Sequence, residues 1–391
     1  MSSAEMIERR SEIAVSAIET RKSSKQFIYV QIVRFIAATS VVIFHAVGTA
    51  MKHLPDQSAS LYWIFRHGDH GVDIFFVISG FIICYSNYYS KTTSLKFLLR
   101  RLQRIVPIYW LFTLAMVALS VLIPSAFSET DWINPRHVLM SMTFLSFVDG
   151  KMPIVFVGWS LEYEMLFYLT VAVLLFRARK VWDDLIIIFS LLAMLSVLPV
   201  SSGLQALSVF FTNPILLEFV YGVIVAKLFL DQRVAPLALI AVSIATLVVF
   251  VSDPINRIIV AGLPACLLVL AAAVLSKKRQ HLTLIERIFG VLGDASYSIY
   301  LLQVFMISGA VKVLVKLGAL PIDLIVLITT LVTILAGYLS YVWLERPSMQ
   351  FFNRLGASRR ELISPVVSQS SRTGHAHQVM RNQPGTDGAT R

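Results

Sequence analysis

The sequence predicts an all-α, polytopic integral membrane protein with about ten transmembrane helices. Of its 391 residues, 57% are hydrophobic and 15% are charged, whereas about a quarter of the residues in a soluble domain are charged. The apolar residues gather in runs close to the roughly 20 residues that a helix needs to span a bilayer. Short basic clusters separate these runs, so the bilayer explains the net charge of +11 better than a nucleic acid partner does.

Ten apolar segments are predicted as spans from their length and composition. In chain order they are residues 27–50, 71–89, 105–124, 158–176, 185–200, 213–230, 235–251, 257–275, 290–311 and 322–344. If the N-terminus is cytoplasmic, the inside segments hold 26 of the 34 lysines and arginines, and the outside segments hold seven. This bias predicts that both termini lie in the cytoplasm.

Three parts are predicted along the chain. Residues 1–26 form a cytoplasmic N-terminal tail that lacks the apolar core and cleavage site of a signal peptide. Residues 27–350 form the ten-helix membrane domain. Residues 351–391 form a cytoplasmic C-terminal tail, whose polar composition is typical of disorder.

The longest outside segment, residues 125–157, contains an apolar stretch from Val138 to Val148 that is too short to span a membrane. A re-entrant piece and an interfacial piece are both consistent with it. The two cysteines, Cys84 and Cys266, fall inside apolar runs, which supports neither a disulfide framework nor a thiolate metal site.

The first span carries two ionisable residues, Arg34 and His45. Eleven positions make about three helical turns, so both side chains lie on one face, roughly 16 Å apart along the axis. Inserting such a residue into lipid costs on the order of 3 kcal/mol or more, and this predicts that the face looks into protein or water. The plainer alternative is that Arg34 reaches the interface and that a neighbouring helix satisfies His45.

The second span begins GVDIFFVISGFII. Asp73 is predicted at the depth of His45, where its carboxylate could orient the imidazole. Ser79 and Gly80 lie near mid-depth, and close packing of helices explains this small pair well.

The stretch KFLLRRLQRIVPIYW places Arg100, Arg101 and Arg104 at the cytoplasmic start of the third span. The positive-inside rule and contacts with anionic lipids explain this cluster without any site. The alternative is a clamp for a phosphorylated ligand, because the guanidinium fork matches phosphate oxygens. Composition does not separate the two.

The fourth span begins GWSLEYEMLFY, in which Glu164 lies deeper than Glu162. A carboxylate inside an apolar helix is a candidate functional group, whereas Trp159 and Tyr163 are typical of an interfacial aromatic belt. The ninth span contains LGDASYSIYLLQ, and the tenth ends YVWLERP, in which ERP predicts a helix stop. These polar residues are consistent with hydrogen bonds between helices or with the lining of a cavity.

Together these motifs resemble the membrane-bound acyltransferase 3 family. The resemblance covers about residues 27–350 and rests on six motifs in the right order: Arg34 with His45, GVDIFFVISGF, RRLQRIVPIYW, WSLEYEMLFY, LGDASYSIYLLQ and ERP. Within the family, the chain most resembles bacterial exopolysaccharide O-acetyltransferases of the succinoglycan type. It departs from the family at Gln303, where many members carry histidine.

The resemblance implies an enzyme of the bacterial inner membrane that transfers an acetyl group from cytoplasmic acetyl-CoA to a hydroxyl of an exopolysaccharide or its lipid-linked sugar precursor. Neither a metal nor a permanently bound cofactor is expected. The expected partners are acetyl-CoA, the polysaccharide acceptor, membrane lipids and polysaccharide-assembly proteins.

The resemblance also suggests residue roles. His45 would act as general base or acyl carrier, Arg34 would meet the donor, and Asp73 and Glu164 would act on the histidine. A second set is expected to bind substrates: Arg100, Arg101 and Arg104 for the CoA phosphates, and Ser79, Trp159, Ser160, Tyr297, Tyr300 and Gln303 as lining.

Two alternatives stay open. The acceptor could be an O-antigen, a lipo-oligosaccharide, peptidoglycan or a macrolide, and the acyl group could be larger than acetyl. A transporter of polysaccharide or lipid also suits many spans with buried charges, although the sequence shows no pair of related halves with broken helices.

Overall fold

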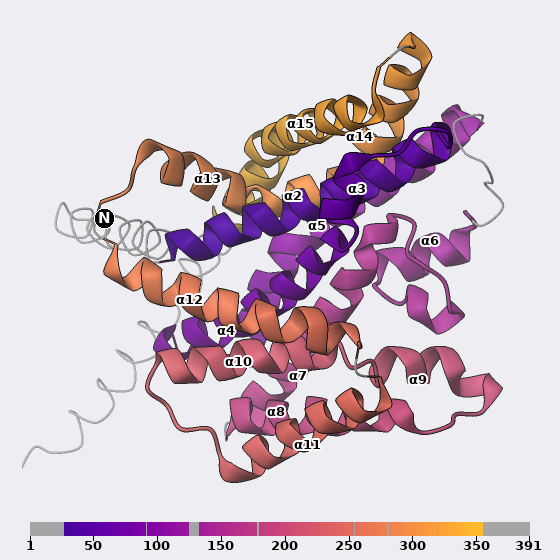
Figure 1. Cartoon of the computed structure of the whole chain (residues 1–391). Helices are drawn as coiled ribbons and strands as arrows, with labels where there is room; N and C mark the ends of the chain where they lie inside the picture. Colours follow the sequence, from indigo (N-terminus) through magenta and orange to yellow (C-terminus); the bar gives the residue numbers. More distant parts are fainter. Residues whose placement is uncertain are drawn as a thin grey trace, which may run out of the picture.

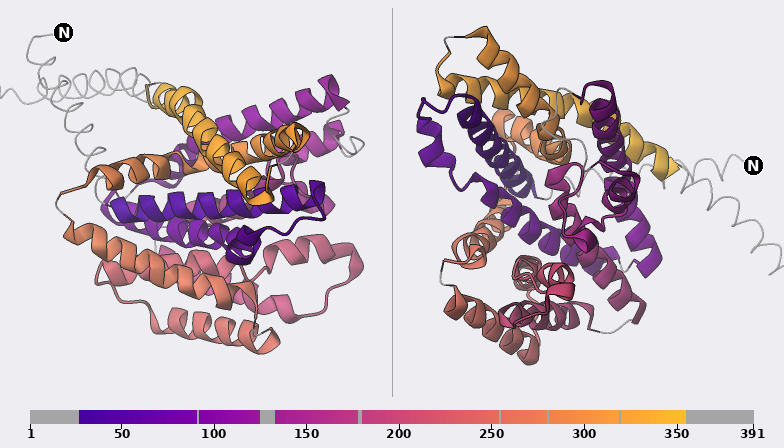
Figure 2. Two further views of the ribbon diagram at one scale, coloured as in Figure 1. Left: turned by 45° about the horizontal axis from the view of Figure 1, so that its top comes forward. Right: turned by 90° about the vertical axis from the view of Figure 1, so that its right-hand side faces the viewer.

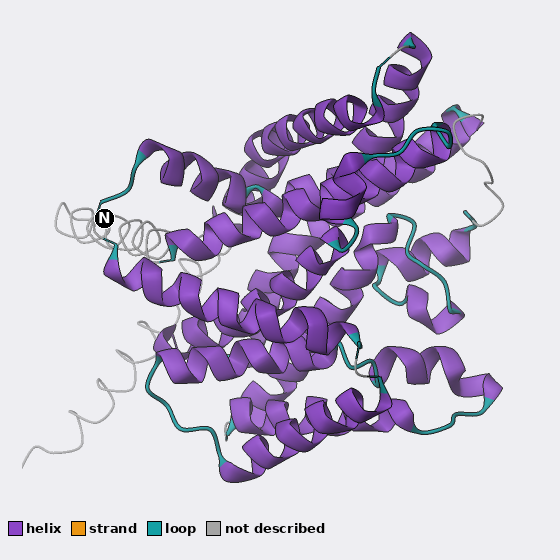
Figure 3. Cartoon of the chain, viewed as in Figure 1, coloured by secondary structure: helices purple, strands orange, loops and turns teal. Residues whose placement is uncertain are grey.

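The computed structural model describes residues 27–90, 92–124, 133–177, 180–253, 255–279, 281–318 and 320–354. Over these ranges the chain forms helices joined by loops, without a strand, as Figure 3 shows. The predicted N-terminal tail and residues 355–391 of the predicted C-terminal tail lie outside the described residues.

The longer helices run roughly parallel or antiparallel to one another in a single bundle (Figures 1 and 2). They are α2 (Ile28–His53), α4 (Gly71–Ser90), α5 (Ser94–Leu122), α7 (Trp159–Arg177), α8 (Val181–Met194), α10 (Leu216–Phe229), α11 (Pro236–Ser252), α12 (Leu263–Lys278), α14 (Ser296–Leu317) and α15 (Ile322–Ser340). Shorter helices lie between them: α3 (Ser60–Phe65), α6 (Pro135–Met142), α9 (Gln205–Phe211) and α13 (Leu284–Asp294).

Within the described residues, 8 helical segments are long and apolar enough to cross a membrane, so the prediction of a polytopic helical membrane protein is confirmed. The predicted spans at 185–200 and 235–251 correspond to α8 and α11, which have 14 and 17 residues. Both are shorter than the roughly 20 residues of a typical span. The total of ten therefore stays a prediction.

The predicted ninth span, residues 290–311, is wrong in its bounds. Helix α13 ends at Asp294, and the membrane-length helix α14 then runs from Ser296 to Leu317. Helix α13 is a separate element with its own N-terminal capping box, in which Thr283 and Glu286 satisfy each other's backbone N–H groups. The break at Ala295 places Asp294 at the end of α13 rather than inside a span.

Helix α2 lies at the centre of the bundle, where it packs against α4, α12, α13, α14 and α15 (Figure 1). Small side chains let these neighbours approach it, since Ala37, Ala38, Ala46 and Ala50 are fully buried. The helix that carries Arg34 and His45 is therefore the one around which the others are arranged.

The first turn of α2 is held by α12 and α13. The Tyr29 backbone N–H donates to Ser276 Oγ at 3.0 Å, and the Tyr29 hydroxyl donates to Glu286 Oε1 at 2.6 Å. The hydrogen bond from Tyr29, followed by that from the Thr283 backbone, lowers the pKa of Glu286 to about 2. Because this pKa is depressed, the contact stabilises the fold fully above the ordinary carboxyl range, and its contribution is lost as the pH falls towards 2.

Helices α4 and α10 cross at their glycines. A Cβ atom on Gly80 would lie 2.2 Å from Phe219 O, and one on Gly222 would lie 2.1 Å from Val77 O. No side chain fits at such distances, so glycine is what lets the two backbones touch. The interpretation of Gly80 as a packing residue agrees with this contact.

We predict that Gly222→Ala lowers the stability of the protein by about 1–3 kcal/mol, because the added methyl group forces α4 and α10 apart. The measurement is the apparent Tm of the purified protein in detergent. Gly48→Ala is the matched control, since a Cβ at Gly48 would meet nothing within 4 Å. If the apparent Tm falls equally in both variants, or falls in neither, the close crossing of α4 and α10 is contradicted.

The part of the segment before α7 that the structure describes, residues 133–158, folds back onto the bundle. Tyr109 and Ser141 share a hydrogen bond of 2.9 Å, and Trp110 Nε1 donates to Met142 O at 2.8 Å. The Ser146 N–H donates to Glu162 Oε1 at 2.8 Å, which ties the segment to α7. The predicted short apolar stretch is thus the helix α6 and the turn Ser146–Asp149, and the segment brings Phe156 to α2.

Candidate active site

A cavity of about 170 Å³ lies among α2, α4, α5, α7 and α14. Eight of the residues that the sequence singled out line it: Arg34, Ser79, Arg101, Arg104, Ser160, Glu164, Tyr297 and Tyr300. They come from five helices that are far apart in the sequence. We refer to this space as the arginine cavity.

Three arginines line one part of the cavity: Arg34 from α2, and Arg101 and Arg104 from α5. The Arg101 guanidinium lies over the rings of Phe97 and Tyr168, at 5.7 and 5.9 Å from their centroids. Both contacts are in the range of cation–π interactions. Such a group is held in place while its N–H donors stay available to an anion.

Glu164 balances this positive charge. It accepts a hydrogen bond from Ser79 Oγ at 3.0 Å and another from the Tyr168 hydroxyl, and its charge acts on Arg34, Arg101 and Arg104. No hydrogen bond or ion pair joins it to His45 among the described residues. The structure thus places Glu164 beside the arginines and does not support its predicted pairing with the histidine.

Two further carboxylates, which were not among the predicted site residues, interact electrostatically with the arginines. The charges of Glu345 and Asp294 act on both Arg34 and Arg104. Glu345 is buried and accepts a hydrogen bond from Ser298 Oγ at 2.6 Å. The ERP motif contains Glu345, but the motif predicts a helix stop and not a buried carboxylate.

That helix stop is wrong. Residues Tyr341–Glu345 form a π-helical turn, and the helix then continues to Arg354. The widened turn comes just before Pro347, which lacks the N–H that a regular helix would use. The same turn directs Glu345 into the protein.

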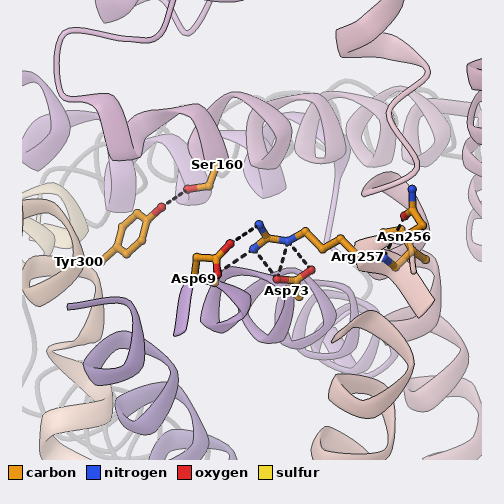
Figure 4. Close-up of polar contacts among 7 residues, drawn as sticks. Asp69, Asp73, Ser160, Asn256, Arg257 and Tyr300 are labelled. Carbon is orange, nitrogen blue, oxygen red and sulfur yellow. Dashed lines mark hydrogen bonds and ion pairs between the residues drawn. The ribbon is translucent and has the colours of Figure 1, made fainter. Parts of the chain in front are cut away.

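At the other end of the cavity, Ser160 and Tyr300 form a polar partition (Figure 4). Their hydroxyl groups lie 2.9 Å apart, and both interact with Val157 O, at 3.0 Å from Ser160 Oγ and 2.9 Å from the Tyr300 hydroxyl. The Phe75 ring packs against Tyr300 at 6.1 Å. This partition joins α7 to α14, and it lies between the lining of the arginine cavity and the segment that contains Phe156 and Val157.

His45 lies next to that segment and does not line the arginine cavity. Its ring contacts Phe44 and Phe156, with centroids 5.2 and 5.1 Å away. Among the described residues it makes no hydrogen bond or ion pair. The carboxylate whose charge acts on it is that of Asp69, a residue that the sequence reasoning missed.

Among the described residues, Asp73 forms no hydrogen bond or ion pair with His45, so the prediction that it orients the imidazole is not supported. Its carboxylate is fully buried and pairs with Arg257, with Nε at 2.8 and 2.9 Å from the two oxygens and Nη2 at 2.6 Å. Arg257 also donates from Nη1 to Asp69 Oδ2 at 2.8 Å and from Nη2 to Asp69 O at 2.7 Å (Figure 4). Arg257 thus joins the start of α12 to the start of α4.

Besides His45 and Asp73, three further predicted residues lie outside the cavity lining. Arg100 is exposed. Trp159 packs against the rings of Phe76 and Tyr163, at 6.3 and 6.0 Å. Gln303 is fully buried and donates from Nε2 to Tyr300 O at 2.9 Å, so it supports the helix that carries the partition. Among the described residues, no group of three His, Cys, Asp or Glu side chains could hold a metal ion.

The family model described as "Acyltransferase domain" matches residues 27–341. The chain is 36% identical over 308 residues to the exopolysaccharide production protein ExoZ of Rhizobium meliloti (strain 1021). The aligned region covers 76% of this chain and 93% of that relative. No solved structure matches the chain.

Proposed function

Since the chain belongs to the acyltransferase 3 family, we propose that it transfers an acetyl group from cytoplasmic acetyl-CoA to a hydroxyl of an exopolysaccharide or of its lipid-linked sugar precursor. The observation that carries this proposal is the arginine cavity, in which three guanidinium groups face one space inside an apolar bundle. The name of the relative from Rhizobium supports an exopolysaccharide as the acceptor.

In this proposal, Arg101 and Arg104 bind the phosphates of the donor. Arginine forms bidentate, charge-assisted hydrogen bonds with phosphate oxygens, and both residues lie near the start of α5. A space of about 170 Å³ is too small for the whole of CoA. It suits the acyl thioester with part of its arm, while the nucleotide would lie at the mouth of the cavity. Arg34 would then face the arm of the donor.

His45 supplies the base. In a direct transfer, its neutral imidazole takes the proton of the acceptor hydroxyl while the oxygen attacks the thioester carbon, and CoA leaves as the thiolate. In a two-step transfer, the imidazole nitrogen attacks the thioester carbon first and CoA leaves as the thiolate. The acceptor oxygen then attacks the acetyl group on the histidine, and the imidazole leaves with the proton of the acceptor hydroxyl. Both routes leave the same products, and both require the acetyl group to pass the partition formed by Ser160 and Tyr300.

We predict that the double variant Arg101→Gln/Arg104→Gln raises the KM for acetyl-CoA by about tenfold or more, because two charge-assisted phosphate contacts are lost. The measurement is acetyl transfer from radiolabelled acetyl-CoA in membrane vesicles. The matched control is Arg100→Gln, which removes a neighbouring charge that does not line the cavity. Reporter fusions verify the orientation of every variant, because basic residues also set the topology.

If Arg100→Gln raises the KM as much as the double variant does, the cluster acts through its general charge or through anionic lipids, and the donor site is wrong. A KM close to the wild-type value in the double variant would contradict it as well.

A further inference from the structure

A second cavity, of about 950 Å³, opens at the end of the bundle where α2 ends. It lies between the end of α2, the C-terminal half of α5, the later turns of α14 and the segment 151–156. Most of its lining is apolar and includes Met116, Leu119 and Phe305. Lys52, Lys151 and Lys312 also line it. We refer to it as the lysine cavity.

The lysine cavity reaches the candidate catalytic residue. Phe156 lines the cavity, and its ring contacts the His45 ring at 5.1 Å. Ser160 and Tyr300, in contrast, line the arginine cavity. Phe156 comes four residues before Ser160 in the chain, so His45 lies beside the short segment that connects the lining of one cavity with that of the other.

Part of the lining of the lysine cavity is a stretch of α14 that other parts of the protein leave exposed. Helices α5 and α14 touch through Phe112 and Phe305, whose ring centroids are 5.7 Å apart. Beyond this contact both helices line the cavity, and Ser308 and Gly309 are exposed. A Cβ atom at Gly309 would meet nothing within 4 Å. Because α14 is long and apolar enough to cross a membrane, this exposed stretch would face lipid in a bilayer.

The positive charge of the lysine cavity favours an anionic ligand. Lys52 and Lys151 are exposed, and neither forms an ion pair with a described residue. By the positive-inside rule, basic residues are rare on the outer side of a bilayer protein, yet three of the seven predicted there line this one cavity. An apolar wall that opens to lipid, next to ammonium groups, is complementary to an apolar chain with an anionic head.

We propose that the lysine cavity is the acceptor site and that it binds a polyprenyl-diphosphate-linked oligosaccharide. The lysines hold the diphosphate, the walls of α5 and α14 hold the first isoprene units, and a sugar hydroxyl reaches His45 past Phe156. This inference rests on the proposed acyl transfer and names the acceptor class for it.

The test measures binding of farnesyl diphosphate, as a short probe, to the purified full-length protein in detergent. Farnesol tests the apolar chain alone, and inorganic diphosphate tests the charge alone. We expect farnesyl diphosphate to bind at least about tenfold more tightly than either, because it combines both contacts. Equal affinity for farnesol would overturn the role of the lysines, and equal affinity for inorganic diphosphate would overturn the role of the apolar walls.

Two pairs of variants test the location. Lys52→Gln/Lys151→Gln should weaken probe binding by about tenfold, whereas Arg66→Gln/Lys316→Gln removes the same charge from the same end without touching the cavity lining. Gly309→Phe should fill the cavity at the exposed stretch of α14 and weaken binding similarly. Its control is Gly48→Phe, at another helical glycine with free space that does not line the cavity.

Acetyl transfer measured on the same preparations separates this inference from the proposed function. If the protein transfers acetyl but all four variants bind the probe like the wild type, the acceptor site is wrong and the enzyme assignment stands. If the probe binds in the expected pattern but no acetyl is transferred, the site stands and the proposed function fails.

Discussion

Replacing His45 by alanine should lower acetyl transfer by about 10²–10⁴-fold, the range that a general base contributes. The side chain should be removable without loss of the fold, because it is partly buried between two phenylalanine rings and gives no hydrogen bond to the described residues. The measurement is transfer from radiolabelled acetyl-CoA in vesicles that contain equal amounts of each protein.

His281→Ala is the control for loss of a histidine, since His281 is exposed and lies in the loop between α12 and α13. Mass spectrometry of the wild-type protein after exposure to acetyl-CoA alone distinguishes the two routes. Acetyl on His45 supports the two-step route, and its absence with full transfer supports the direct one. Full activity of His45→Ala would remove this residue from the mechanism.

Replacing Arg257 by glutamine should destabilise the protein by about 3–5 kcal/mol, as expected when a buried ion pair loses one partner. Asp73 is fully buried and would lose its counter-ion. The carboxyl group of Glu218, also fully buried, interacts electrostatically with both Asp73 and Arg257. Loss of the guanidinium thus leaves two acidic groups together in the core.

The double variant Asp73→Asn/Arg257→Gln should recover much of the lost stability, because it also removes the carboxylate that lost its partner. Arg136→Gln is the control, since Arg136 pairs with Asp149 at the surface, with 69% of its side chain exposed, and such pairs contribute only about 0–1 kcal/mol. Thermal unfolding in detergent measures all four proteins. A double variant no more stable than Arg257→Gln would contradict the ion pair as the cause.

The fold class could be predicted because it depends on local properties. Length and hydropathy decide whether a segment spans, so the sequence reasoning found most of the membrane helices. The prediction of the ninth span was wrong in its bounds. The sequence around Asp294 predicts one continuous helix, but the helix is interrupted at Ala295. The pattern of apolar residues does not show such a break.

The arginine cavity was predicted in part, because ionisable residues in a bilayer gather away from lipid. Depth along the bilayer can be estimated from a sequence, but the direction in which a side chain points around the helix bundle cannot. Asp73 was placed correctly near the end of its helix, yet it pairs with Arg257, which lies 184 residues away and was counted among the outside charges. The contact of Asp69 with Arg257 was missed for the same reason.

The most direct test of acyl transfer is proton NMR of the surface polysaccharide from a deletion strain complemented with the wild-type protein or with His45→Ala. The O-acetyl methyl signal should disappear in the deletion, return with the wild type and stay absent with an equally expressed His45→Ala protein. An unchanged O-acetyl signal in the deletion would contradict the account, and loss of the whole polymer from the surface would favour a transporter.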